Sequence, residues 1–207
     1  MRKPQTVAAL ETLGRVRLSP SFFMRDFLYS EIANFHGMQN IPDDPDLAIE
    51  VGKLLCDQLL EPLQATFGSL AIRSGYRSPS VNQLGNEQQL GCGSNEHNYA
   101  AHIWDRRDAQ RNKGAMACVV VPWFADRYEE GADWRSLAYW IHDHLPYSSM
   151  QFFPKLCALN IGWRENPVRI IYSFIEPRGS LFRSGVPEQG EHAGMYADFP
   201  AFRRDAA

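Results

Sequence analysis

Residues 70–105 read LAIRSGYRSPSVNQLGNEQQLGCGSNEHNYAAHIWD, a short apolar run that leads through a turn into a long polar loop. The run LAIRSGYRSP has the β-like residues and the Gly and Pro ending that are typical of a strand followed by a turn. The loop then carries His97, His102 and Asp105, whose side chains are of the kinds that bind divalent metal ions. Arg77 lies just beyond the strand, where its cation could receive an anionic group. We expect any chemistry of the chain to be concentrated in this stretch.

Helical patterns precede this stretch. Ser19 and Pro20 have the N-cap and first-turn signature of a helix over PSFFMRDFLYSEIAN, which would bury Phe23, Phe27 and Leu28. Apolar residues then recur at helical spacing, which predicts a long amphipathic helix over residues 45–66. The apolar residues of this predicted helix are Leu47, Val51, Leu54, Leu55, Leu59 and Leu63.

Strand-like runs follow it. The segment AMACVVVPW is continuously apolar and β-branched, which predicts a buried central strand, and alternation in HIWD predicts another. Residues 133–144 predict a helix, and SMQFF, ALNIGW and VRIIYSFI predict short strands. We therefore expect an α+β fold, with N-terminal helices packed on a small, mostly antiparallel sheet. The expected boundaries are a leader over residues 1–18, one domain over 19–178 and an irregular or wrapping tail over 179–207.

Composition limits the class of protein. The 207 residues, 44% apolar and 12% aromatic, suffice for one well-buried domain. A net charge of -3 without a long Lys/Arg block argues against nucleic acid as the main partner. No secretory signal or run of about 20 apolar residues is present, so we expect a soluble protein that is cytoplasmic or phage-associated. The aromatic residues, Phe152 and Phe153 among them, are predicted to be core rather than a sugar-binding platform.

Three segments in this order, LQATFG, LAIRSGYRSPSVN and GSNEH with a nearby aspartate, resemble the zinc D-alanyl-D-alanine carboxypeptidase family. The resemblance runs from near Leu18 to about Ile175. It implies a compact metallopeptidase domain that holds zinc and hydrolyses peptidoglycan-type peptides. A cell-wall peptide would then be the expected partner, and the sequence predicts no oligomeric state.

The resemblance also implies roles for single residues. His97 and Asp105 would be zinc ligands, and Arg77 would anchor the substrate or stabilise an oxyanion. Three further polar residues, Ser78, Ser94 and Asn160, would contact the substrate.

The sequence departs from the family pattern at three points. His97 and Asp105 are eight residues apart, whereas the family spaces them by seven. Asn160 stands where a late strand of the family carries its third ligand, a His, and another alignment would place Arg169 there. The segment MQFFPKLCA lacks the expected catalytic carboxylate, for which Glu96 is the candidate substitute.

These departures leave three hypotheses open. The first is a zinc metallopeptidase, and the second is an inactive pseudo-peptidase kept as a binding or structural module. The third is a metal enzyme of altered chemistry, in which His97, His102 and Asp105 hold zinc or iron(II). Each of these residues could instead have an ordinary role. His97 could be an exposed loop histidine, His102 could be hydrogen-bonded within the fold, and Asp105 could cap a turn.

Overall fold

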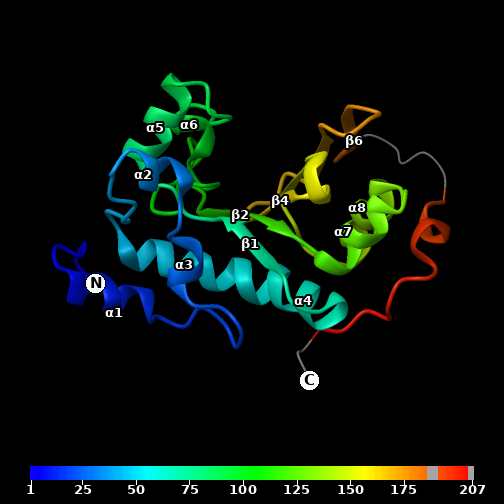
Figure 1. Cartoon of the computed structure of the whole chain (residues 1–207), viewed down its shortest axis with the longest axis horizontal. Helices are drawn as coiled ribbons and strands as arrows, with labels where there is room; N and C mark the ends of the chain where they lie inside the picture. The colour runs from blue at the N-terminus through cyan, green and yellow to red at the C-terminus, as the bar shows by residue number, and fades with distance from the viewer. Residues whose placement is uncertain (186–190, 205–207) are drawn as a thin grey trace.

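The computed structural model describes residues 1–185 and 191–204, which form an α+β fold around a six-stranded sheet (Figure 1). The strand order is β1-β2-β4-β3-β5-β6, and among the paired strands of the described sheet only β3 and β5 are parallel. The predicted fold class and the mostly antiparallel sheet are therefore confirmed. The strands are β1 (Ala71–Ser74), β2 (Gly114–Val120), β3 (Ser149–Phe152), β4 (Leu159–Arg164), β5 (Ile170–Ser173) and β6 (Gly179–Arg183).

The helices surround this sheet unevenly. Figure 1 shows the run from α3 to α4 along the sheet, with α2, α5 and α6 gathered at one end and α7 and α8 at the other. No helix in the described part of the chain is both long and apolar enough to cross a membrane. The α-helices are α1 (Val7–Gly14), α2 (Glu31–Phe35), α3 (Pro45–Leu55), α4 (Glu61–Phe67), α5 (Pro79–Glu87), α6 (Asn95–Asn98), α7 (Pro122–Glu129) and α8 (Trp134–His144). Shorter helical turns are η1 (Met24–Phe27), η2 (Cys56–Leu60), η3 (Lys155–Cys157) and η4 (Ala193–Tyr196).

The long helix predicted over residues 45–66 is confirmed, with a π-helical turn in its middle. Asp44 caps its start by accepting a hydrogen bond from the Leu47 N–H at 3.1 Å, and Pro45 occupies the first turn. The π-helical η2 ends at Leu60, two residues before Pro62, which has no backbone N–H to donate to the helix. Gly68 ends the run with φ of 88°.

This helical run covers one face of the sheet. Ala117 and Val119 of β2 and Ile161 of β4 are fully buried in the same core cluster as Val51 and Leu59 of the run. Because side chains alternate along a strand, the residues between them face the opposite side. That opposite side is where the candidate site lies.

Several predictions about the first half of the chain were wrong. Residues 19–34 form η1 and α2 instead of one helix, because the Ser30 hydroxyl accepts from the Ala33 N–H and starts a new helix there. Phe23 is 39% exposed and Leu28 half-buried, whereas Phe27 is fully buried as expected. The predicted loop over residues 82–98 contains most of α5 and all of α6, and HIWD forms turns instead of a strand.

The first 18 residues and residues 191–204 both contribute contacts to the domain core. Leu13 of α1 is fully buried in the main core, so the predicted leader over residues 1–18 is part of the fold. The segment predicted to be an irregular or wrapping tail contains β6, and residues 191–204 pack back onto the domain. Phe199 is central to this packing, with its ring centroid 5.1 Å from Trp123 and 5.8 Å from Phe67. The rest of the predicted tail, residues 186–190 and 205–207, lies outside the described residues.

Candidate binding groove

A row of side chains crosses five strands on the face of the sheet away from the α3–α4 run. The register pairs Ser74 with Cys118, Cys118 with Asn160, Asn160 with Gln151, and Gln151 with Tyr172. Since neighbouring strands are about 4.8 Å apart, four such steps span roughly 19 Å. We call these five residues the cross-sheet row.

A groove of about 540 Å³ lies over most of this row. Strands and loops both contribute to it, and the loop after β1 supplies much of one wall. Its lining includes Glu31, Arg73, Ser74, Arg77, His97, His102, Met116, Cys118, Gln151, Phe153, Lys155, Asn160 and Phe174. A cavity of this size is typical of sites for small molecules and short peptides.

The groove is lined by more positively charged than negatively charged side chains. Arg73, Arg77 and Lys155 line it together with a single carboxylate, that of Glu31. Within residues 1–185 and 191–204, none of the three cations forms an ion pair. Arg77 donates instead to the amide oxygen of Asn82 and to the Cys92 sulfur, each at 3.0 Å. The groove therefore favours an anionic ligand.

His102 forms a neutral wall of the groove. Its side chain is deeply buried, and Nδ1 lies 2.9 Å from the Gly75 carbonyl oxygen, which can only accept. Burial, aided by the positive charge of Arg77, lowers the pKa of His102 to about 4. At neutral pH the ring therefore carries its proton on Nδ1, and Nε2 keeps a lone pair.

Two carboxamides occupy the middle of the floor. The Asn160 amide donates to the Gln151 side-chain oxygen at 2.9 Å, and Asn160 also hydrogen-bonds with His102. Cys118, their neighbour in the cross-sheet row, is a protonated thiol at neutral pH because burial raises its pKa to about 11. The floor thus offers hydrogen-bonding groups without a charged nucleophile.

Of the remaining predicted site residues, only His97 reaches the groove. It is exposed on α6, whose N-cap Ser94 accepts from the His97 N–H at 3.3 Å. Ser78 is likewise the N-cap of α5 and accepts from the Val81 N–H at 3.4 Å. Neither serine nor Glu96 lines the groove, and Glu96 is fully exposed with its pKa lowered by its own backbone N–H and by Ser94. The two serines therefore cap helices.

Asp105 is directed away from the groove. Its side chain is fully buried, and Oδ2 accepts from the backbone N–H groups of Asp43 at 2.7 Å and Asp44 at 3.4 Å. Burial raises the pKa of Asp105 despite these bonds. The buried Tyr76 hydroxyl interacts with the same carboxylate, and burial together with the negative charge of Asp105 raises the pKa of Tyr76. The carboxylate fastens the turn that leads into α3.

The predicted metal set is therefore not assembled. His97 and His102 line the groove whereas Asp105 does not, and the described residues contain no group of three or more His, Cys, Asp or Glu placed to hold a metal ion. Asn160, at the position of the expected third ligand, uses its amide to bond Gln151. This donor set fits neither zinc nor iron(II).

We predict that Asp105→Ala lowers the free energy of unfolding by about 2 kcal/mol, because it leaves two backbone N–H groups without their acceptor. Urea titration measures this loss. Asp44→Ala is the control, since it removes an exposed carboxylate that caps α3, and it should cost about 1 kcal/mol. An Asp105→Ala protein of unchanged stability would show that the carboxylate does not fasten the turn.

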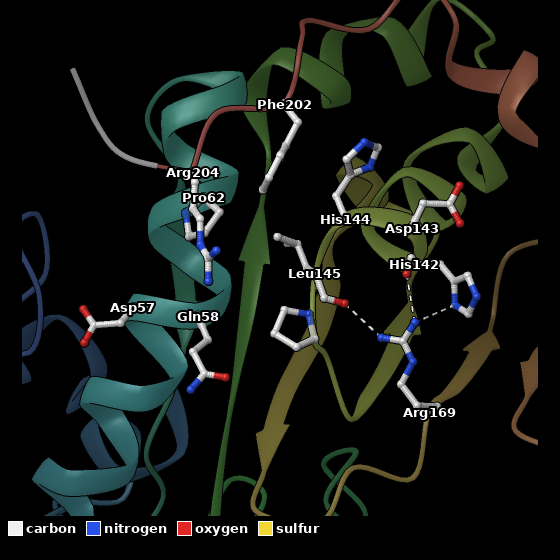
Figure 2. A pocket seen from close by; sticks show the side chains of 11 residues that line it. Asp57, Gln58, Pro62, His142, Asp143, His144, Leu145, Arg169, Phe202 and Arg204 are labelled. Atoms are coloured by element: carbon white, nitrogen blue, oxygen red, sulfur yellow. Dashed lines mark hydrogen bonds between the residues drawn. The ribbon is translucent and has the colours of Figure 1, made fainter.

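The alternative ligand position, Arg169, lies at a second cavity of about 590 Å³ (Figure 2). Its guanidinium donates to the carbonyl oxygens of Leu145 at 2.9 Å and His142 at 2.8 Å, and lies 4.1 Å from the Tyr147 ring centroid. Figure 2 shows this arginine directed at the end of α8. Phe202 and Arg204 of the C-terminal segment line the other side of the cavity. Arg169 thus joins β5 to α8 and is remote from the predicted ligands.

The groove residues that the sequence did not predict include Arg73, Gln151, Phe153, Lys155 and Phe174. Alternation in SMQFF is a signal that could have placed Gln151 and Phe153 on one face, opposite Met150 and Phe152. No known protein family matches the chain, and no curated protein or solved structure is detectably similar to it.

Proposed function

We propose that this chain is a binding domain that recognises the anionic end of a peptide in the groove and does not hydrolyse it. The observation that carries the proposal is the set of three cations, Arg73, Arg77 and Lys155, that line the groove without ion-pair partners in the described part of the chain. A carboxylate placed between two guanidiniums can form bidentate, charge-assisted hydrogen bonds.

The floor of the groove supports binding over hydrolysis. A zinc peptidase needs three donor side chains around the metal and a base for the metal-bound water. Here Asp105 is committed to the turn before α3, Asn160 to Gln151, and Glu96 lies outside the groove. The resemblance to the D-alanyl-D-alanine carboxypeptidases then applies to fold and ligand class, and suggests cell-wall peptides that end in D-alanine.

Calorimetric titration tests this proposal. The probe is an acetylated L-Lys-D-Ala-D-Ala peptide, used as the free acid and as the C-terminal amide, with D-alanine release assayed in parallel with added zinc. We expect the free acid to bind, the amide to bind at least tenfold more weakly, and no D-alanine to appear. Equal binding of acid and amide contradicts recognition of the anionic end, and zinc-dependent release contradicts the absence of hydrolysis.

We further predict that Arg73→Gln weakens binding of the free acid about fivefold, because an exposed guanidinium contributes less than a buried one. The amide should bind this variant and the wild type alike. Arg15→Gln is the matched control, since it removes one positive charge from a side chain that is 69% exposed and outside the groove. A fivefold loss in both variants would indicate general charge attraction instead of a contact.

A further inference from the structure

The groove has two chemically different ends along the cross-sheet row. Arg73 and Arg77 belong to β1 and the loop after it, at one edge of the sheet. Phe153 and Phe174 follow β3 and β5, on the far side of β4. The carboxamides of Asn160 and Gln151 lie between these ends. Lys155 of η3, two residues after Phe153, adds a third cation, so we expect a ligand that is anionic at the arginine end and apolar where it meets the two rings.

The apolar end is a partly exposed aromatic shelf formed by Phe153, Tyr172 and Phe174. Phe153 and Phe174 stack with centroids 5.2 Å apart and an interplanar angle of 9°. Tyr172 meets Phe174 edge-on at 5.1 Å, and the two rings are 38% and 41% exposed. Phe152, directed to the opposite face, is fully buried as predicted, whereas Phe153 is half-buried and packs against a small cluster of Val120, Ala125 and Ala158. Exposed, adjoining rings beside a cavity indicate a surface for an apolar group.

We infer, on the basis of the proposed function, that the ligand is an extended peptide lying across the strands, with its C-terminal carboxylate at Arg73 and Arg77 and a large apolar side chain on the aromatic shelf. The shelf extends from β3 to β5, three to four strand steps or roughly 14–19 Å from β1, and an extended chain rises about 3.4 Å per residue. The apolar residue therefore lies about four to six residues before the C-terminus.

The middle of the groove fits a peptide backbone. Carboxamides both donate and accept, so Asn160 and Gln151 can bond a peptide C=O and N–H. His102 supports this arrangement, because its ring is fixed by the Gly75 carbonyl at Nδ1 and hydrogen-bonds with the Asn160 side chain. Recognition thus has three parts in a fixed order: guanidiniums, amides and rings.

The test is a calorimetric scan with acetylated octa-alanine peptides in which one alanine is replaced by tryptophan, each as free acid and amide. We expect the free acid with tryptophan four to six residues before the C-terminus to bind about tenfold more tightly than octa-alanine. Phe174→Ala should reduce this preference to twofold or less and leave the preference for acid over amide intact. Phe35→Ala, at a phenylalanine 86% exposed and outside the groove, should change neither preference.

The outcomes separate this inference from the proposed function. Preference for the acid without any preference for tryptophan overturns the inference alone. A tryptophan preference that is strongest at the last residue, or that survives Phe174→Ala, also overturns it. Loss of the preference for acid over amide in the wild type overturns the proposed function, whatever tryptophan does.

Discussion

Replacing Trp104 with alanine should lower the free energy of unfolding by about 3–5 kcal/mol, the usual cost of removing a buried tryptophan. The indole is fully buried, with its centroid 5.2 Å from that of Phe27, and Nε1 donates to the Met116 carbonyl oxygen at 3.0 Å. A Cβ on Gly52 of α3 would lie 2.9 Å from the Trp104 ring, so helix and ring are in close contact. The residue therefore joins η1, the long helical run and the central strand.

Urea titration of the purified variant measures this loss. Trp163→Ala is a matched control, because that indole is only half-buried and donates to the Gln58 side chain at 2.9 Å. It should cost clearly less, about 1–2 kcal/mol. Equal losses in the two variants would contradict the central position that the structure gives to Trp104.

His102 should make the protein less stable in mild acid. Its pKa is about 4 in the fold and about 6.5 when unfolded, so between these values the unfolded chain binds the proton more tightly. The free energy of unfolding should therefore fall by about 3 kcal/mol as pH drops from 6.5 to 4. Below pH 4 both states are protonated and this contribution stays constant.

The comparison of His102→Gln with wild type isolates this effect, because the carboxylates titrate in both proteins. Urea titration gives the free energy of unfolding of each protein at pH 7 and at pH 4. The loss between these pH values should be about 3 kcal/mol smaller in His102→Gln than in wild type. His36→Gln removes an exposed histidine and should behave as wild type. An unchanged pH dependence in His102→Gln would show that this ring is solvated in the fold.

Local sequence signals predicted the elements that depend on them. The helical spacing from Leu47 to Leu63 found the α3–α4 run, and the β-branched run around Val119 found β2. The α7 helix was missed because PWFADRYE follows that strand without a break, and Pro122 occupies its first turn. Whether Leu13 belongs to a loose leader or to the core depends on tertiary contacts that the local pattern does not contain.

The site was harder to predict because it depends on register. Arg77, His97 and His102 were found by residue type, and the groove brings them together. Asp105 was assigned to the metal from its residue type and from the family resemblance, yet its partners at Asp43 and Asp44 are about sixty residues earlier in the sequence. The cross-sheet row joins five strands through pairings between distant segments, and alternation within one strand cannot reveal them.

The return of residues 191–204 over the domain has a practical consequence for proteolysis. His192 and Tyr196 bond Asp143 of α8, and two hydrogen bonds join Thr66 to Arg203. Cleavage before residue 191 would leave only these non-covalent contacts to hold the segment, and its dissociation would remove Phe199 from the rings of Phe67 and Trp123. A nicked protein would then self-associate through this aromatic surface, and its yield, rather than its affinity for ligand, would be the first property to suffer.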